Sequence, residues 1–386
     1  MNILHYVKHN TDSFKKTPLN HLDILAFTWL TYFNFTSVED DLPFYLHEFV
    51  HKSCFNDMAS LHESFVPKTS ETLFKRMVAN PRYKDVQFVY NYERKSRSKA
   101  MQFGVLAFII DGKLLICFEG TDLSYVGFKE DFMMSYTDSI ASYPIAEHIY
   151  KELSSRYPNL PIILSGHSKG GNVAAYCLAA LEDDSRIEEV VSYEGPGFHS
   201  DSVFKAHPER EAKLTKYVPK ESIVGILLNS QTKIKIVRSG TVGILQHNAL
   251  KWYIQGNDFI YSSKLAYSSR FIDKAANAWI NSLSSEEKER FTKLFFDNLE
   301  EYGPEQFEDL YKRFFKQIPS LAKAAKNLDA DDKKFVRSVI GRLRKQVFVT
   351  AGNEIAEFPK KIIPKNIREL PEKMAAQLKA PKKEEK

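Results

Sequence analysis

The sequence contains few cysteines, no long apolar run and no block of a single charge sign. Three cysteines in 386 residues are a small and odd number, which excludes a disulfide framework and favours buried free thiols. No apolar stretch approaches the roughly 18–20 residues needed to span a bilayer. Lys8 interrupts the N-terminal segment, which lacks the apolar core of a signal peptide. We therefore expect a soluble, cytoplasmic protein, and transient contact with a membrane surface is left open.

The net charge of +5 is distributed along the chain rather than concentrated. This distribution argues against nucleic-acid binding, since only the C-terminal tail clusters lysines with few apolar residues. Hydrophobic residues make up 43% of the chain, an ordinary share for a globular protein, but 28 Phe and 19 Tyr are unusually many. These aromatic side chains suit either a core or a pocket for an apolar substrate.

Short β-rich runs from residue 86 onward predict an α/β fold. Strands are expected over 86–92, 103–110, 114–118, 160–164, 190–193, 214–218 and 233–238. Helices are expected over 144–156 and 172–181. Asp111-Gly112 is a strong hairpin signal between the second and third of these strands. Strands that alternate with helices at this spacing predict a mostly parallel sheet after an antiparallel start.

Composition divides the chain into four expected regions. Residues 1–80 form a helical segment packed on the core, and within it 22–32 has an amphipathic helical pattern. Residues 81–270 form the α/β core, and 271–350 form a charged helical extension. Residues 351–386 form a basic tail that is expected to be disordered. The extension suits a cap over a site, a dimer contact or a partner surface, and the oligomeric state is left open.

The most informative motif is Gly166-His-Ser168-Lys169-Gly170, which lies between an apolar strand and a small-residue helix. This is G-x-S-x-G in the setting that a nucleophile elbow needs. The two glycines permit a tight turn where side chains would clash with the neighbouring strand and helix. The turn raises the hydroxyl of Ser168 above the sheet and leaves the backbone N–H of Lys169 free to face an oxyanion. The other interpretation is a glycine-rich connection with an incidental serine.

A nucleophilic serine needs a base, and the base needs an acid that orients it. In the α/β-hydrolase order of serine, acid and histidine, the base lies downstream of the serine. Three histidines lie there: His199, His207 and His247. His247 follows the last predicted strand and is the predicted base. Glu194 and Glu221 each end a strand at the edge where open α/β sheets place their sites, and spacing leaves the acid open between them.

A second oxyanion donor is expected near Ser168. The strand over 114–118 ends in Glu119-Gly-Thr-Asp122, and Thr121 is placed to supply its backbone N–H, with its hydroxyl as a further donor. An ordinary turn at a strand end explains the same residues.

At these residues the chain resembles a bacterial lipase-like family that is catalogued mainly as a domain of unknown function. The block F-E-G-T-D-L-S-Y-V-G-F-K-E-D-F-M-M at 118–134 is similar to the family's R-G-T-D…G-W-K-E-D-F-x-M. The blocks G-H-S-K-G-G-N, Y-E-G-P-G-F at 193–198, V-P-K-E-S-I-V-G at 218–225 and G-I-L-Q-H at 243–247 follow in the same order. The family is distantly similar to class 3, fungal-type lipases, and the resemblance covers roughly residues 1–265.

The resemblance implies an α/β-hydrolase fold with Ser168 as nucleophile, His247 as base, and Thr121 and Lys169 as oxyanion donors. Three positions depart from the family pattern: Glu119 replaces arginine, Phe128 replaces tryptophan, and Glu194 replaces aspartate. The acid of class 3 lipases falls near Ser222, which cannot serve. This leaves Glu194 or the neighbouring Glu221, and Glu194 is slightly favoured because an acidic residue at that position fits the family pattern.

The sequence thus predicts a serine hydrolase that cleaves an ester of a lipid or another small-molecule acyl substrate, without a cofactor. The alternative is a non-catalytic module of the same fold that binds an acyl ligand or a protein partner. The aromatic and methionine residues of the stretch 122–143 suit a lid over an acyl chain, and core packing explains them equally well.

His47-Glu-Phe-Val-His51 matches the H-E-x-x-H zinc motif, and Glu71 lies at a plausible third-ligand distance. The flanking Lys52 and Ser53 do not suit the buried helix of such a site. We predict no metal here.

Overall fold

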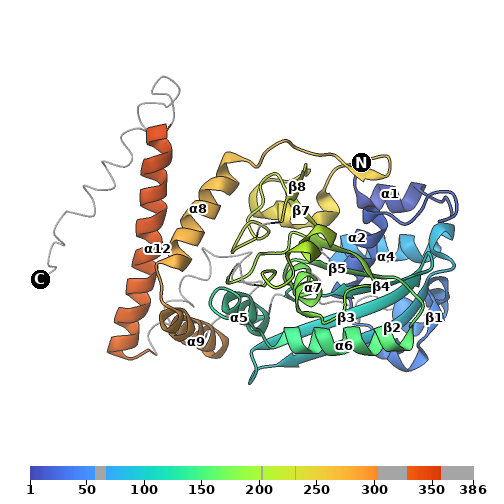
Figure 1. Ribbon diagram of the computed structural model, residues 1–386, viewed down its shortest axis with the longest axis horizontal. Helices are drawn as coiled ribbons and strands as arrows, with labels where there is room; N and C mark the ends of the chain where they lie inside the picture. The colour runs from blue at the N-terminus through green and yellow to red at the C-terminus, as the bar shows by residue number, and fades with distance from the viewer. Residues whose placement is uncertain (57–66, 123, 201–202, 231, 303–327, 358–386) are drawn as a thin grey trace, which may run out of the picture.

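The computed structural model describes residues 1–56, 67–122, 124–200, 203–230, 232–302 and 328–357. Its core is an eight-stranded sheet with the strand order β1 to β8 (Figure 1). The strands are β1 Phe44–Tyr45, β2 Gln87–Ser96, β3 Met101–Ile110, β4 Lys113–Phe118, β5 Ile162–His167, β6 Ile187–Tyr193, β7 Leu214–Pro219 and β8 Ile234–Val237. Strands β1 to β4 pair antiparallel and β4 to β8 pair parallel, which confirms the predicted mostly parallel sheet after an antiparallel start.

The hairpin between β3 and β4 forms at the predicted turn. Asp111 and Gly112 have φ angles of 50° and 72°, and Ile110 pairs with Lys113. Two successive positive φ values are what a two-residue type I′ turn requires. A short two-stranded sheet also follows β8, formed by β9 Ile254–Gln255 and β10 Asp258–Phe259.

Helices cover both faces of the sheet (Figure 1). The helices up to the elbow are α1 Ile3–His9, α2 His21–Trp29, α3 Ser53–Asn56, α4 Pro67–Ala79, α5 Tyr125–Met133, α6 Ser142–Arg156 and α7 Lys169–Ala180. The 3₁₀ turns are η1 Leu30–Tyr32, η2 Thr36–Asp41, η3 Leu46–His51, η5 Pro81–Tyr83, η6 Pro208–Lys213, η7 Gly243–His247 and η8 Ala249–Lys251. Along β3, Leu106 and Phe108 join the core under the N-terminal helices, whereas Val105 and Ala107 join the core under α6 and α7. Both faces of this strand are therefore buried, which explains its continuous apolar sequence.

Helix α2 is buried on all sides rather than amphipathic as predicted. Every residue from Leu22 to Trp29 is buried. The helix lies against the sheet, where the hydroxyls of Thr28 and Ser165 are 2.7 Å apart. The same core contains buried Cys54 and Cys117, and Cys177 is buried on the other face, so the three expected free thiols are confirmed.

A buried ion pair fastens the N-terminal segment to the core. Arg82 donates from Nε and Nη2 to the two carboxylate oxygens of Asp23, at 3.0 and 2.6 Å, and both side chains are fully buried. The hydroxyls of Tyr6 and Tyr83 donate to the same carboxylate at 3.1 and 2.9 Å. Because the Asp23 carboxylate is hydrogen-bonded to all of these donors, this buried polar cluster fixes how the N-terminal helices pack on the sheet.

Three helices gather at one end of the molecule (Figure 1): α8 Tyr267–Asn281, α9 Ser285–Tyr302 and α12 Ala330–Glu357. Leu283, Phe291 and Val339 form a small core among them, against which Phe132 of α5 packs. None of the described helices is both long and apolar enough to cross a bilayer. Most of the predicted tail, from residue 358 onward, lies outside the described residues.

Candidate active site

Ser168 occupies a strained turn between the end of β5 and the start of α7. Its φ and ψ are 56° and −128°, a conformation that residues with a side chain rarely adopt and that costs on the order of 1–3 kcal/mol. The flanking glycines are sterically required. A Cβ on Gly166 would lie 2.0 Å from the carbonyl carbon of Gly170, and a Cβ on Gly170 would lie 2.1 Å from the oxygen of Phe118. The G-x-S-x-G motif therefore forms a tight strand–turn–helix elbow around Ser168.

His247 lies beside the elbow, at the end of η7. Its ring centroid is 4.6 Å from that of His167, the residue before the serine. Nε2 of His167 lies 2.8 Å from the carbonyl oxygen of His247, so this nitrogen is a donor, and Nδ1 lies 2.6 Å from the hydroxyl of Tyr32. Burial and the nearby His247 lower the pKa of His167 well below its ordinary value. A neutral His167 thus donates to the loop of His247 and accepts from Tyr32.

Glu194 is the carboxylate that approaches His247. Its Oε1 lies 3.9 Å from Nδ1 of His247. Oε2 of Glu194 and Nδ1 of His247 are both buried, and neither has a hydrogen-bond partner among the residues that the structure describes. Such a pair of buried, unsatisfied atoms is uncommon, and catalytic hydrogen bonds are often long before substrate binds.

The environment of Glu194 also holds its carboxylate in one orientation. Oε1 accepts from the hydroxyl of Ser222 at 2.8 Å and from the backbone N–H groups of Ile223 and Gly225 at 3.3 and 3.2 Å. Ser222, which follows β7, thus holds a carboxylate that follows the neighbouring strand β6. Glu194 has a φ of 56°, which is a strained value for glutamate. Backbone strain at both Ser168 and Glu194 is typical of functional positions.

Glu221 has a different set of contacts. Its Oε2 accepts from the backbone N–H of Gly243 at 2.5 Å, at the start of η7. Its own N–H donates to Oε1 of Gln246 at 2.9 Å. Glu221 therefore holds both ends of the turn that carries His247.

The side chains of the two expected oxyanion donors both contact helix α5. The hydroxyl of Thr121 donates to Asp131, whose two oxygens lie 2.8 and 2.7 Å away. Since a hydroxyl has one proton, this contact corrects the expectation that the hydroxyl would serve as a third donor. The backbone N–H of Thr121 remains as its candidate donor.

The side chain of Lys169 is buried in a polar cluster behind the elbow. Its Nζ donates to Oε2 of Glu130 at 2.9 Å, to Oε1 of Gln102 at 2.8 Å and to the backbone oxygen of Gln102. Lys169 and Glu130 are 1% and 0% exposed. Burial opposes the charge of Lys169, yet Glu130 and Asp131 raise the pKa of its ammonium above the ordinary value. The contact between Lys169 and Glu130 ties the first residue of α7 to α5.

Glu119, one of the departures from the family pattern, joins this cluster. Its Oε2 accepts from Nε2 of Gln102 at 2.8 Å, while the amide oxygen of Gln102 accepts from Lys169. The amide of Gln102 thus links Glu119 to the ammonium of Lys169. The sequence analysis did not identify Gln102, Glu130, Asp131 or Tyr32, although K-E-D at 129–131 was the available signal.

The aromatic stretch after Thr121 forms helix α5 and packs in two directions. Glu130 and Asp131 face the elbow cluster and Thr121, as described above. Phe132 faces the C-terminal helices, with ring centroids 5.9 Å from Trp279 and 5.6 Å from Phe291. Lys129 forms an ion pair with Asp297 of α9. Helix α5 therefore connects the candidate oxyanion donors to the C-terminal helices.

Burial of the Asp131 carboxyl raises its pKa to about 6, even though Lys169 and the Thr121 hydroxyl act in the opposite direction. Stability from protonated Asp131 is present below the ordinary carboxyl pKa and is lost as the pH rises through about 6. We expect the free energy of unfolding of Asp131→Asn to improve relative to the wild type between about pH 4 and about pH 7. Denaturant titrations across this range measure the difference, and a constant offset between the two proteins would contradict the assignment.

The H-E-x-x-H segment forms a 3₁₀ turn, η3, rather than an α-helix. Glu48 accepts from the backbone N–H of Tyr45 at 2.6 Å, and Nδ1 of His47 lies 2.9 Å from the carbonyl oxygen of Lys84. A 3₁₀ turn aligns residues three apart, whereas the two histidines are four apart. Within the described part of the chain, no three His, Cys, Asp or Glu side chains are arranged to hold a metal ion.

The mostly parallel sheet, the flanking helices and the strained serine at the end of β5 are those of an α/β-hydrolase fold. The model of the Mbeg1-like family matches residues 77–297, more than half of the chain, and the chain belongs to this family. This match confirms the family-level resemblance found in the sequence motifs.

Solved structures of three lipases are similar to part of the chain. Lipase II from Rhizopus niveus is 16% identical, with a TM-score of 0.32 and coverage of 42% of this chain and 69% of that chain. The M37 lipase is 14% identical, with a TM-score of 0.32 and coverage of 53% of this chain and 69% of that chain. The Lip2 lipase from Yarrowia lipolytica is 13% identical, with a TM-score of 0.31 and coverage of 46% of this chain and 82% of that chain. Among curated proteins, none matches the chain significantly. The fold assignment accordingly rests on the sheet order and the elbow of this chain.

Proposed function

We propose that the protein is a serine hydrolase that cleaves an ester of a lipid or another small-molecule acyl substrate. The observation that carries the proposal is the strained elbow at Ser168, next to a histidine whose buried Nδ1 has Glu194 as its nearby carboxylate. Strain of this kind persists only where the surrounding structure maintains it, and it gathers at catalytic positions.

In this proposal, Oγ of Ser168 attacks the carbonyl carbon of the ester while His247 accepts its proton. The backbone N–H groups of Lys169 and Thr121 stabilise the oxyanion. His247 then gives the proton to the leaving alcohol, and an acyl-enzyme remains on Ser168. Water, deprotonated by His247, then attacks the acyl carbon, the bond between that carbon and Oγ of Ser168 breaks, and His247 returns the proton to Oγ as the acid leaves. No step needs a cofactor.

Glu194 acts as the acid of the triad and Glu221 as a positioning residue. Glu194 orients His247 through Nδ1 and stabilises the imidazolium that forms during each proton transfer. Glu221 keeps η7 in place through Gly243 and Gln246. Movement of η7 by about 1 Å would close the gap between Glu194 and His247 to hydrogen-bond length.

Hydrolysis of p-nitrophenyl esters of increasing chain length tests the proposed function. We expect wild-type turnover that depends on chain length, and a Ser168→Ala variant whose kcat is lower by about 10⁴-fold or more. The backbone strain at position 168 changes only slightly when serine is replaced by alanine, so the melting temperature of the variant should stay near that of the wild type. Equal rates for folded wild type and Ser168→Ala would instead support the non-catalytic binding module.

A further inference from the structure

The turn that carries His247 exposes apolar side chains next to the candidate active site. Val242 is 69% exposed and Leu245 is 48% exposed, and they precede His247 by five and two residues. Val242 is the extended residue just before η7, and Leu245 lies within the turn, so both exposed side chains belong to the tip that carries His247. Apolar side chains that cluster on an exposed tip are typical of a surface that contacts a partner or a lipid.

Hydrogen bonds hold this tip in place and keep the side chains of Val242 and Leu245 exposed to solvent. Gln246 is buried, and its side chain accepts from the N–H of Glu221 and donates to the oxygen of Thr241 at 2.8 Å. Its backbone oxygen accepts from Nε1 of Trp252 at 2.8 Å. Because the turn is fastened through Gln246 on one side, Val242 and Leu245 remain on the other side in solvent.

The sequence segment that forms this tip carries only positive charge, although the carboxylate of Glu221 reaches its backbone at Gly243. From Thr232 to Asn257 there is no Asp or Glu, and the charged residues are Lys233, Lys235, Arg238 and Lys251. Backbone hydrogen bonds join the base of the tip to two of them, from Gly240 N–H to Lys251 and from Tyr253 N–H to Arg238. The ring of Tyr253, itself exposed, lies against Gly240. The backbone thus places exposed Arg238, half-buried Lys251 and the aromatic Tyr253 at the base of the apolar tip.

We propose that this surface, formed by Val242, Leu245, Tyr253, Arg238 and Lys251 and here named the His-loop surface, docks on an anionic lipid bilayer. The basic side chains attract anionic headgroups, and the apolar tip enters the boundary between headgroups and acyl chains. Docking through this turn brings His247 and Ser168 to the lipid surface. The inference rests on the proposed function, because it identifies bilayer lipids as the class of ester that reaches Ser168.

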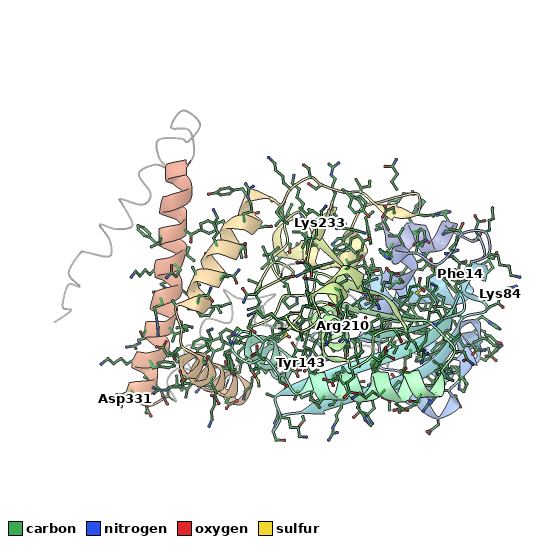
Figure 2. All side chains as sticks on the ribbon, in the orientation of Figure 1. Phe14, Lys84, Tyr143, Arg210, Lys233 and Asp331 are labelled. Atoms are coloured by element: carbon green, nitrogen blue, oxygen red, sulfur yellow. The ribbon has the colours of Figure 1, made fainter. Side chains whose placement is uncertain are left out.

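Helix α12 supplies a matched control from the same chain. Val347 and Val349 are 40% and 41% exposed, and the exposed Arg344 and Lys345 precede them. Figure 2 shows Lys233, before β8, and Asp331, at the start of α12, at separate places on the molecule. A double Val→Ser change on α12 removes two exposed apolar side chains that are next to basic residues, and it leaves the residues of the His-loop surface unchanged.

Co-sedimentation with vesicles tests the proposal in the Ser168→Ala background, where no lipid is consumed. We expect binding to vesicles of phosphatidylcholine with added phosphatidylglycerol, and markedly weaker binding to phosphatidylcholine alone. Val242→Ser with Leu245→Ser should lower the partition coefficient by about tenfold or more, since two exposed apolar side chains are lost. Val347→Ser with Val349→Ser should leave it unchanged, and both variants should keep the wild-type melting temperature.

Three results would overturn the proposal. The first is no binding to anionic vesicles. The second is that the α12 variant loses vesicle binding while the variant of Val242 and Leu245 keeps it. The third is that the wild type is a dimer and that the changes at Val242 and Leu245 dissociate it. The last would assign the tip to a second copy of the chain. If only the docking proposal is wrong, the wild type still hydrolyses short soluble esters. If the proposed function is wrong, the wild type hydrolyses no ester but still binds the vesicles.

Discussion

Replacing Glu194 by Gln is expected to lower kcat on a p-nitrophenyl ester by about 10⁴-fold. The amide can still accept from Ser222 and the backbone, but it cannot stabilise the imidazolium of His247. Oε1 of Glu194 lies 3.9 Å from Nδ1, and among the described residues the buried Nδ1 has no hydrogen-bond partner that could take over this role. Steady-state kinetics at saturating ester measure the effect.

Glu221→Gln is the matched control for this result. A glutamine oxygen accepts from the N–H of Gly243 as a carboxylate does, so η7 should keep its conformation. We expect kcat to fall by less than about tenfold, because this residue acts only through the position of the turn. A larger loss in Glu221→Gln than in Glu194→Gln, with both proteins folded, would exchange the roles of the two acids.

The second large effect concerns the ion pair behind the elbow. Glu130→Gln should reduce the free energy of unfolding by about 3–5 kcal/mol, because it leaves the ammonium of Lys169 buried without its carboxylate. Urea denaturation followed by circular dichroism measures the change. The free energy should fall at constant m-value, since the same surface is exposed on unfolding.

A double-mutant cycle with Lys169→Met separates the ion pair from ordinary packing. Once Glu130 is already Gln, Lys169→Met removes a charge that has lost its partner and should cost little or restore stability. The backbone N–H at position 169 is retained, so the oxyanion contact survives in any folded variant. Additive losses in the double variant would show that the two side chains do not act as a pair.

Much of the fold could be predicted because its signals are local. Asp111-Gly112 specifies its hairpin turn through backbone conformation alone, and the apolar runs of β3 and β4 allow few alternatives. The elbow is equally local, since Gly166 and Gly170 are required by contacts within the same strand–turn–helix unit. The amphipathic prediction for residues 22–32 was wrong because burial on every side depends on distant segments that pack around α2.

The acid and its supports were not predictable from spacing. Glu194 and Glu221 end adjacent parallel strands, so the sequence offers both at the same sheet edge. The contacts of Ser222 and Gly243, which distinguish the two carboxylates, depend on how η7 folds back over β6 and β7. Glu130 and Lys169 likewise meet across 39 residues, and their pairing arises from the packing of α5 rather than from a local pattern.

Site-specific labelling with a fluorophosphonate probe tests the central claim most directly, because the probe reports an activated serine without knowledge of the substrate. We predict a single adduct on the peptide that contains Ser168, no adduct in Ser168→Ala, and strongly reduced labelling in His247→Ala. Folded wild-type protein that does not react, or labelling that persists in Ser168→Ala, would contradict the assignment of Ser168 as the nucleophile.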